Sequence, residues 1–325
     1  MNRQRRVLIG SLLILALLLT TTGYVLWRRT EVDAAHGAEA LHLERAGTVV
    51  YVDRAGGGTV RQVTRSGKEV GKGPACQRAA AAGSTLICLH ARPGPFSSQA
   101  RIYTGASEKP KVTLPLWGEP SRARVSPSGR LVAWTVFRTG DSYAVPGQFS
   151  TTAGIYDVRD GRHFGSLEDF AARVDGKPYD KPDLNFWGVT FASDDRTFYA
   201  TMASKSRTWL VRGDLTKRTL TALHENVECP SLSPDGRRIA YKKKTGGTWR
   251  LHVLDLRTMA ETALAERADI DDQASWLGAD TVAYAKSHDG APAVFTVPAD
   301  GSGAPRRLLD GSSPTLTNGQ EQKGS

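Results

Sequence analysis

An internal repeat is the feature that most constrains the fold of this 325-residue chain. Each copy has a short strand, a tight polar turn and an apolar strand that contains an aromatic residue. Pro and Gly in the turns supply the fixed φ and the positive φ that tight turns need, and the alternating residues that follow are typical of a β-strand. Four clear copies occupy residues 123–137, 188–204, 229–244 and 273–286, with the aromatic residues Trp134, Tyr199, Tyr241 and Tyr284.

Two weaker copies precede these, at residues 43–54 and 76–92. Successive turns are 37, 45, 67, 40 and 44 residues apart, and most intervals suit the roughly 40–50 residues of a four-stranded propeller blade. Strand–turn–strand patterns follow four of the hairpins, at residues 153–167, 208–223, 248–264 and 291–309. The sequence therefore predicts an all-β fold, a six-bladed β-propeller over residues 41–317.

The first copy lacks an innermost strand, and the end of the chain offers a replacement. Residues 312–317 resemble the first strand of a blade, and we expect them to complete blade one and so remove an exposed sheet edge. The longest interval has its excess around Leu167–Trp187, where Glu168–Val174 is expected to form one helical turn before a loop rich in Lys, Asp and Pro. Residues 318–325 are expected to be a disordered tail.

The amino-terminal segment contains 21 uncharged residues, Val7–Trp27, between Arg6 and Arg28. At 1.5 Å per helical residue this run spans the roughly 30 Å core of a bilayer. Three Arg before it and two after it favour a cytoplasmic amino terminus, residues 1–6. The alternative is a cleaved signal peptide, although the run exceeds the usual length of about 7–15 apolar residues. We expect an uncleaved transmembrane signal anchor over residues 7–27, a linker over 28–40, and an extracytoplasmic carboxy-terminal domain on a single-pass protein of the cell membrane.

Half of the net charge of +10 lies near this anchor. Residues 1–30 contain five Arg and no acidic residue, which leaves a net charge of +5 for the other 295 residues. The run Lys242–Lys244 follows an apolar strand pattern and has no interleaved aromatic residues, so a solvated strand end is favoured over a phosphate-binding patch. We therefore expect no nucleic-acid partner.

The three cysteines, Cys76, Cys88 and Cys229, fit an oxidising compartment. If the chain turns at Ala82-Gly83, facing residues have numbers that sum to 164, as those of Cys76 and Cys88 do. A cross-strand disulfide is then favoured over two unpaired thiols. Cys229 would remain as a buried thiol.

Motifs of catalysis and metal binding are missing from the sequence. There is no G-x-S-x-G elbow, zinc-protease helix, P-loop or EF-hand loop, and the seven His are scattered without metal-ligand spacing. We therefore expect no cofactor. Enzymatic propellers spread their carboxylates over several blades and leave little local signature, so a propeller hydrolase that uses carboxylates and a bound cation remains the alternative.

The strongest candidate site comes from the architecture, because the leading residues of innermost strands lie at the mouth of the central channel. These residues are Arg122, Arg124, Asn185, Glu228, Asp269, Asp271, Asp272 and Gln273. Asp271, Asp272 and Glu228 come from neighbouring blades and would either converge on a cation or basic partner residue, or cap turns and bind channel water.

The segment Ser233-Pro234-Asp235-Gly236 with the strands after it resembles the Pro-Asp-Gly propeller repeat of TolB and its relatives. The spacing around residues 225–236 and 271–286 also resembles membrane-anchored TolB-like proteins of high-GC actinobacteria. The resemblance covers about residues 40–317 and implies a six-bladed propeller that acts by contact with another protein. We expect this propeller to be monomeric. We therefore expect an envelope or secreted protein partner, with a sensor of small sugars or peptidoglycan fragments as a further possibility.

Overall fold

The computed structural model describes residues 15, 17, 20–23, 40–94, 97–138 and 150–317. It divides into two units, residues 1–39 and 40–325. Residues 20–23 are helical, and within the described part of the chain no helix is both long enough and apolar enough to cross a bilayer. The predicted anchor lies largely outside the described residues, as do all but residue 40 of the predicted linker and the whole of the tail at 318–325.

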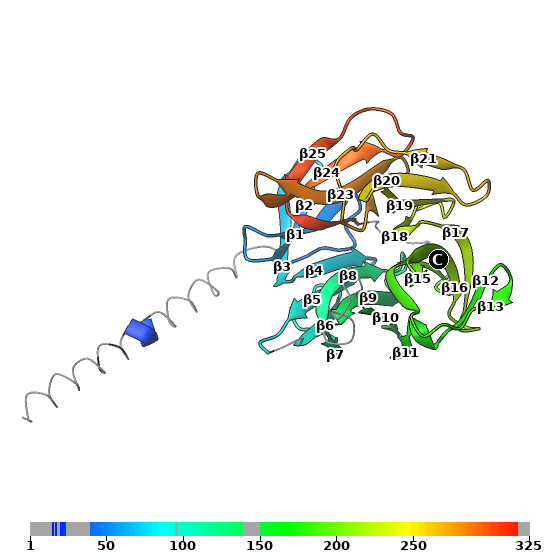
Figure 1. Ribbon diagram of the computed structural model, residues 1–325. Coiled ribbons are helices and arrows are strands. Elements are labelled where there is room, and N and C mark those ends of the chain that lie inside the picture. The colour runs from blue at the N-terminus through cyan, green and yellow to red at the C-terminus, as the bar shows by residue number, and fades with distance from the viewer. Residues whose placement is uncertain are drawn as a thin grey trace, which may run out of the picture. The chain divides into compact units, whose positions relative to one another are not determined.

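The described residues of the second unit form six β-sheets arranged around one axis, and within each blade neighbouring strands are antiparallel (Figure 1). Blade one contains, from the axis outward, β26 (Ser312–Leu316), β1 (Thr48–Asp53), β2 (Thr59–Thr64) and β3 (Glu69–Ala75). Blade two contains β4 (Arg78–Ala82), β5 (Thr85–Ala91), β6 (Ser97–Thr104) and β7 (Val112–Trp117). Blade three contains β8 (Glu119–Val125), β9 (Leu131–Arg138), β10 (Ser150–Asp157) and β11 (His163–Ser166).

The remaining blades follow the same pattern. Blade four contains β14 (Asn185–Phe191), β15 (Thr197–Ser204), β16 (Arg207–Asp214) and β17 (Thr219–Glu225). Blade five contains β18 (Glu228–Leu232), β19 (Arg238–Thr245), β20 (Thr248–Asp255) and β21 (Glu261–Ala263). Blade six contains β22 (Ser275–Trp276), β23 (Thr281–His288), β24 (Ala291–Pro298) and β25 (Arg306–Asp310). The predicted six-bladed propeller is confirmed, and its innermost strands pack against one another in a closed ring.

The end of the chain closes the ring, as predicted. β26 pairs antiparallel with β1, so that Val49 lies opposite Leu316. Just beyond β26, the Thr317 hydroxyl lies 2.7 Å from that of Thr48 and donates to the Arg45 carbonyl oxygen at 2.6 Å. These contacts join the two ends of the propeller within one blade.

The turns of blades three and five show why their sequences recur. In Ser126–Gly129 and in Ser233–Gly236, the glycine N–H donates to the carbonyl oxygen of the serine, at 2.8 and 2.9 Å. Gly129 and Gly236 have φ values of +79° and +72°, a conformation that a side chain disfavours. Each serine hydroxyl also accepts the backbone N–H five residues further on. Each turn therefore fixes where the next strand begins.

The aromatic residue of each repeat lies in the core. The tyrosines of blades five and six are fully buried, and each places its hydroxyl on a carboxylate: Tyr241 donates to Glu261 and Tyr284 to Glu266, both at 2.5 Å. Burying a phenol is tolerated because its polar atom is satisfied in this way. All four repeat aromatics, Trp134, Tyr199, Tyr241 and Tyr284, are buried.

The predicted helical turn over Glu168–Val174 is wrong. A short 3₁₀ turn, η2 (Leu167–Asp169), is followed by two strands, β12 (Ala171–Val174) and β13 (Lys177–Pro178). β12 pairs in parallel with β17, the outermost strand that blade four would otherwise have. The unpaired backbone groups at that edge offer hydrogen bonds to the insertion, so tertiary context makes it a strand.

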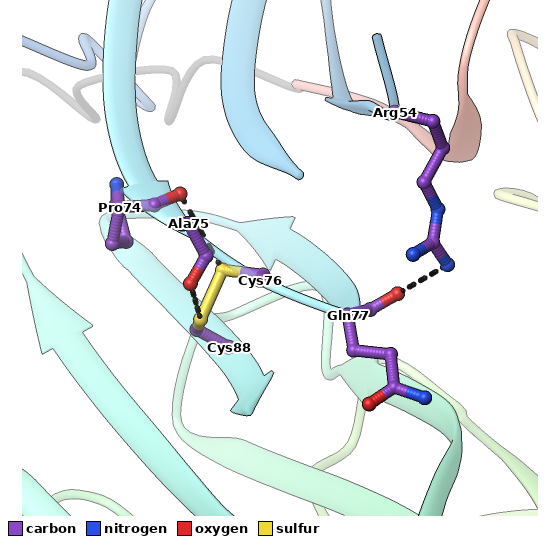
Figure 2. Close-up of a disulfide and its surroundings, with 6 residues drawn as sticks. All are labelled: Arg54, Pro74, Ala75, Cys76, Gln77 and Cys88. Atoms are coloured by element: carbon purple, nitrogen blue, oxygen red, sulfur yellow. Dashed lines mark hydrogen bonds between the residues drawn. A yellow bond between two sulfur atoms is a disulfide. The ribbon is translucent and has the colours of Figure 1, made fainter. Parts of the chain in front are cut away.

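The disulfide between Cys76 and Cys88 is confirmed, with 5.3 Å between their Cα atoms (Figure 2). The predicted hairpin register is wrong: facing residues sum to 167, and Cys88 lies opposite Ala79. Cys76 therefore lies just before β4, in the connection from blade one, and the disulfide ties this connection to β5. Beside it, the Arg54 guanidinium donates to the Gln77 carbonyl oxygen at 2.7 Å. Cys229 is a free, buried thiol, as predicted.

Candidate functional site at the channel mouth

The predicted site residues lie on innermost strands or within four residues before one, except Asp269, which lies six residues before β22 and accepts the Trp249 backbone N–H at 2.7 Å. Asn185 and Glu228 begin β14 and β18, since each is the first residue of its strand. Asp271, Asp272 and Gln273 precede β22, and Arg122 and Arg124 lie within β8. The propeller brings these segments together around the axis because their strands form its inner ring.

Asp271 lies over two buried cations. Its Oδ1 accepts a hydrogen bond from Lys242 Nζ at 2.6 Å and one from Arg122 Nη2 at 3.2 Å. The Lys242 side chain is 3% exposed, whereas that of Asp271 is 67% exposed. Burial raises the pKa of Asp271, but the two cations outweigh burial and hold it below its ordinary value. The three blades that supply these residues are thereby linked by charge.

Glu228 and Trp249 form a second contact at the mouth. The Trp249 indole N–H donates to Glu228 Oε1 at 2.9 Å. The ammonium groups of Lys242 and Lys244 lie 4.5 and 5.6 Å from the centre of a Trp249 ring, within the range of cation–π attraction. The solvated strand end predicted for the lysine run holds for Lys244, which is exposed, whereas Lys242 is buried beneath the tryptophan.

Three other predicted residues connect blades or strands. Asn185 Oδ1 accepts from the N–H and the hydroxyl of Thr151, at 2.9 and 2.6 Å, and so joins blades three and four. Gln273 Nε2 donates to the carbonyl oxygens of Val189 and Pro230, at 3.2 and 2.8 Å. Asp272 Oδ2 accepts the Ala285 N–H at 2.8 Å. These contacts leave the three side chains with clear structural roles.

The arginines of β8 are held deep in the ring. Arg122 Nη1 donates to the Ser121 carbonyl oxygen at 3.0 Å, and Arg124 Nη2 donates to the Ala274 carbonyl oxygen at 3.0 Å. Burial lowers the pKa of Arg124 to about 10, because a charged guanidinium is poorly solvated there. Both arginines therefore carry positive charge into the inner ring.

The predicted carboxylates do not assemble a cation site. Within the part of the chain that the structure describes, no group of three or more His, Cys, Asp or Glu side chains is placed to hold a metal ion. Of the candidate ligands, Asp271 binds Lys242 and Arg122, while Glu228 binds Trp249. The arrangement is instead a network of charge-assisted hydrogen bonds that connects blades.

A cleft of about 720 Å³ extends outward from the mouth over blades four and five. It includes Asn185 and Glu228, which the sequence placed at the mouth, but most of its lining was not predicted. That lining comes from the segment before β14, the β15–β16 turn, the ends of β17 and β19, and the starts of β10 and β20, which come together only when the blades pack. Charged groups of both signs and two tryptophans line the cleft, among them Asp183, Lys205, Arg207, Glu225, Lys244 and Trp249.

Comparison with known proteins places the fold. No protein-family model matches the chain, and a search of curated proteins found no match. Among solved structures, TolB from Acinetobacter baumannii is similar, with a TM-score of 0.58 and 15% identity, covering 83% of this chain and 66% of that one, just under two thirds of its length. A putative TolB from Agrobacterium tumefaciens has a TM-score of 0.50 and 14% identity, with coverage of 83% and 91%. The chain therefore has a TolB-like six-bladed propeller fold.

Proposed function

We propose that this protein is a membrane-anchored, extracytoplasmic β-propeller of the cell envelope that binds another protein at the cleft over blades four and five. The cleft is the observation on which this proposal rests. Its volume of about 720 Å³ and its mixture of charged groups and tryptophans suit a peptide segment or loop of a partner. The TolB-like fold, which both similar structures share, is compatible with a binding module.

Two features support the location. The apolar run of residues 7–27 is long enough to span a bilayer as a helix, and the charges around it favour an exported carboxy-terminal domain. The second feature is the Cys76–Cys88 disulfide, because disulfides persist in oxidising compartments and are rare in reducing ones. A protease-protection assay on whole cells and spheroplasts tests this location, since an exported propeller is digested only when the outer face of the membrane is accessible.

Site-specific photo-crosslinking in intact cells tests the binding cleft. Lys205, an exposed residue in the β15–β16 turn that lines the cleft, is replaced by a photoreactive amino acid. Arg257, exposed in the β20–β21 turn and outside the cleft lining, is the matched control position. We expect a discrete cross-linked protein from position 205 only, and its loss when Lys244→Glu reverses a charge within the cleft. Equal labelling from both positions, or none from position 205, contradicts the proposal.

The hydrolase alternative requires carboxylates that are available to a substrate or a cation. The hydrogen bonds at the channel mouth do not favour it. Asp271 binds two cations, Asp272 a backbone N–H and Glu228 an indole, so each has a partner before any substrate arrives. If an Asp271→Asn variant still cross-links its partner, binding does not depend on this carboxylate, as a hydrolase reaction at the channel mouth would.

A further inference from the structure

A small cavity of about 30 Å³ lies where four blades meet in the inner ring. It is lined by Arg78 of β4, by Arg122 and Arg124 of β8, by Asp272 ahead of β22, and by residues 313–315 of the closing strand β26. The space exceeds the roughly 10–15 Å³ that one water needs by this measure, but it is far too small for a sugar, nucleotide or peptide. This volume suits a water-sized or halide-sized species.

The charges that line this cavity do not balance. Its lining includes three arginines and one aspartate, a formal excess of two positive charges. Asp271 also contacts Arg122, but Lys242 shares that carboxylate. Burial lowers the pKa of Arg78 and Arg124, because nearby carboxylates offset the desolvation of these two groups only in part. Burial also acts on Arg122, but its neighbours Cys229, Asp272 and Asp271 outweigh burial and raise the pKa of that guanidinium. The uncompensated charge therefore lies on Arg78 and Arg124. Uncompensated charge in such a place is costly, and a counterion would relieve it.

Two hydrogen-bond donors are also left over. The Nε atoms of Arg122 and Arg124 are buried and have no hydrogen-bond partner among the described residues. Arg122 is only 9% exposed, and its terminal nitrogens are already bonded to Ser121 and Asp271. Buried donors in native proteins nearly always have an acceptor, so each orphaned N–H indicates a missing one.

We propose that this cavity binds a small inorganic anion of the size of chloride, held by the guanidinium groups of Arg78, Arg122 and Arg124. The anion accepts from the orphaned donors and offsets the excess positive charge. Because β26 also lines the cavity, the anion connects the closing strand of blade one to blades two, three and six. The propeller ring is therefore stabilised by halide.

Thermal unfolding of the purified full-length chain tests this site. Midpoints are measured over a range of sodium chloride or sodium bromide concentrations, with sodium gluconate, too large to enter, keeping ionic strength constant. A ligand bound only by the folded state raises the midpoint with concentration, so we expect chloride and bromide to stabilise and gluconate not to. Arg124→Gln should weaken the apparent halide affinity about tenfold or more, because a charged donor is lost.

The control variant is Arg212→Gln, which removes an exposed arginine of β16 and should leave the halide response unchanged. If Arg124→Gln fails to fold, crystals of the wild-type chain soaked in bromide decide the question by anomalous scattering. A bromide peak between the three guanidinium groups supports the proposal. Water alone in the cavity, or the same midpoint in chloride and gluconate, overturns it.

Discussion

Removing the disulfide by replacing Cys76 and Cys88 with Ala gives the most quantitative test of the fold. The bond closes a loop between residues 12 positions apart, and the loop-entropy relation assigns such a loop about 3 kcal/mol of stabilisation at 25 °C. For a domain of this size, each kcal/mol moves the unfolding midpoint by about 2–4 °C. We therefore expect the double variant to unfold about 6–12 °C below the wild type.

The loop argument makes a second, sharper prediction about the single variants. Either substitution alone opens the loop, so Cys76→Ala and Cys88→Ala should each lose nearly as much stability as the double variant. Cys229→Ala is the control, because that buried thiol lies outside the disulfide. Urea unfolding measures the free energies, and thiol labelling in denaturant should count one reactive thiol in the oxidised wild type and three after reduction.

Two results would refute this reasoning. A loss below about 1 kcal/mol in the double variant would mean that the loop is already constrained in the unfolded chain. Single-variant losses that add up to the double-variant loss would mean that side-chain packing, and not the closed loop, provides the stabilisation.

Three further predictions concern separate parts of the molecule. Burial raises the pKa of Glu261, but hydrogen bonds from Lys243 and two other side chains outweigh it and lower the pKa to about 2. After allowance for solvent screening, the lowered pKa stabilises the fold by about 1–2 kcal/mol above about pH 4.5, and this stability is lost as the pH falls towards 2. Glu261→Gln should therefore flatten acid unfolding in that window, as measured by urea titration. Gly213→Ala should cost about 1–3 kcal/mol in thermal unfolding, because the new Cβ would lie 2.1 Å from the Phe198 ring, and an unchanged midpoint would show that the ring moves freely. Asp271→Asn should destabilise the fold by about 1 kcal/mol at low salt, because it removes a carboxylate from two buried cations. The effect is modest because the Asp271 side chain is well exposed, and an identical urea midpoint would mean that the ion pairs contribute nothing.

The blade repeat was predictable because its determinants are local. A turn such as Ser233–Gly236 fixes its own geometry through hydrogen bonds between residues at most five positions apart, so a few sequence letters identify it. The register of the hairpin around Gly83 was not predictable, since the turn lies one to two residues further along than the sequence suggests. The insertion was mistaken for a helical turn because its strand, β12, exists only by pairing with β17, whose residues lie far along the chain.

The candidate site was predicted in position but not in chemistry. Strand order alone places Asn185, Glu228 and Asp271 near the axis, because leading residues of innermost strands must lie there. Their partners depend on how neighbouring blades pack, and the burial of Lys242 against Trp249 has no local sequence signal. The cleft over blades four and five escaped prediction for the same reason, since turns from two blades form it together.

The closing strand also determines when the protein can finish folding. Thr48 and Thr317 contact each other although they are 269 positions apart, so blade one stays incomplete until nearly the whole chain is available. Contacts between such distant residues form slowly, because the intervening loop must close first. During synthesis, the open side of β1 is an unpaired strand edge that other chains can join. The time between the emergence of residue 53 and that of residue 312 is therefore the period in which a chaperone would protect this protein most.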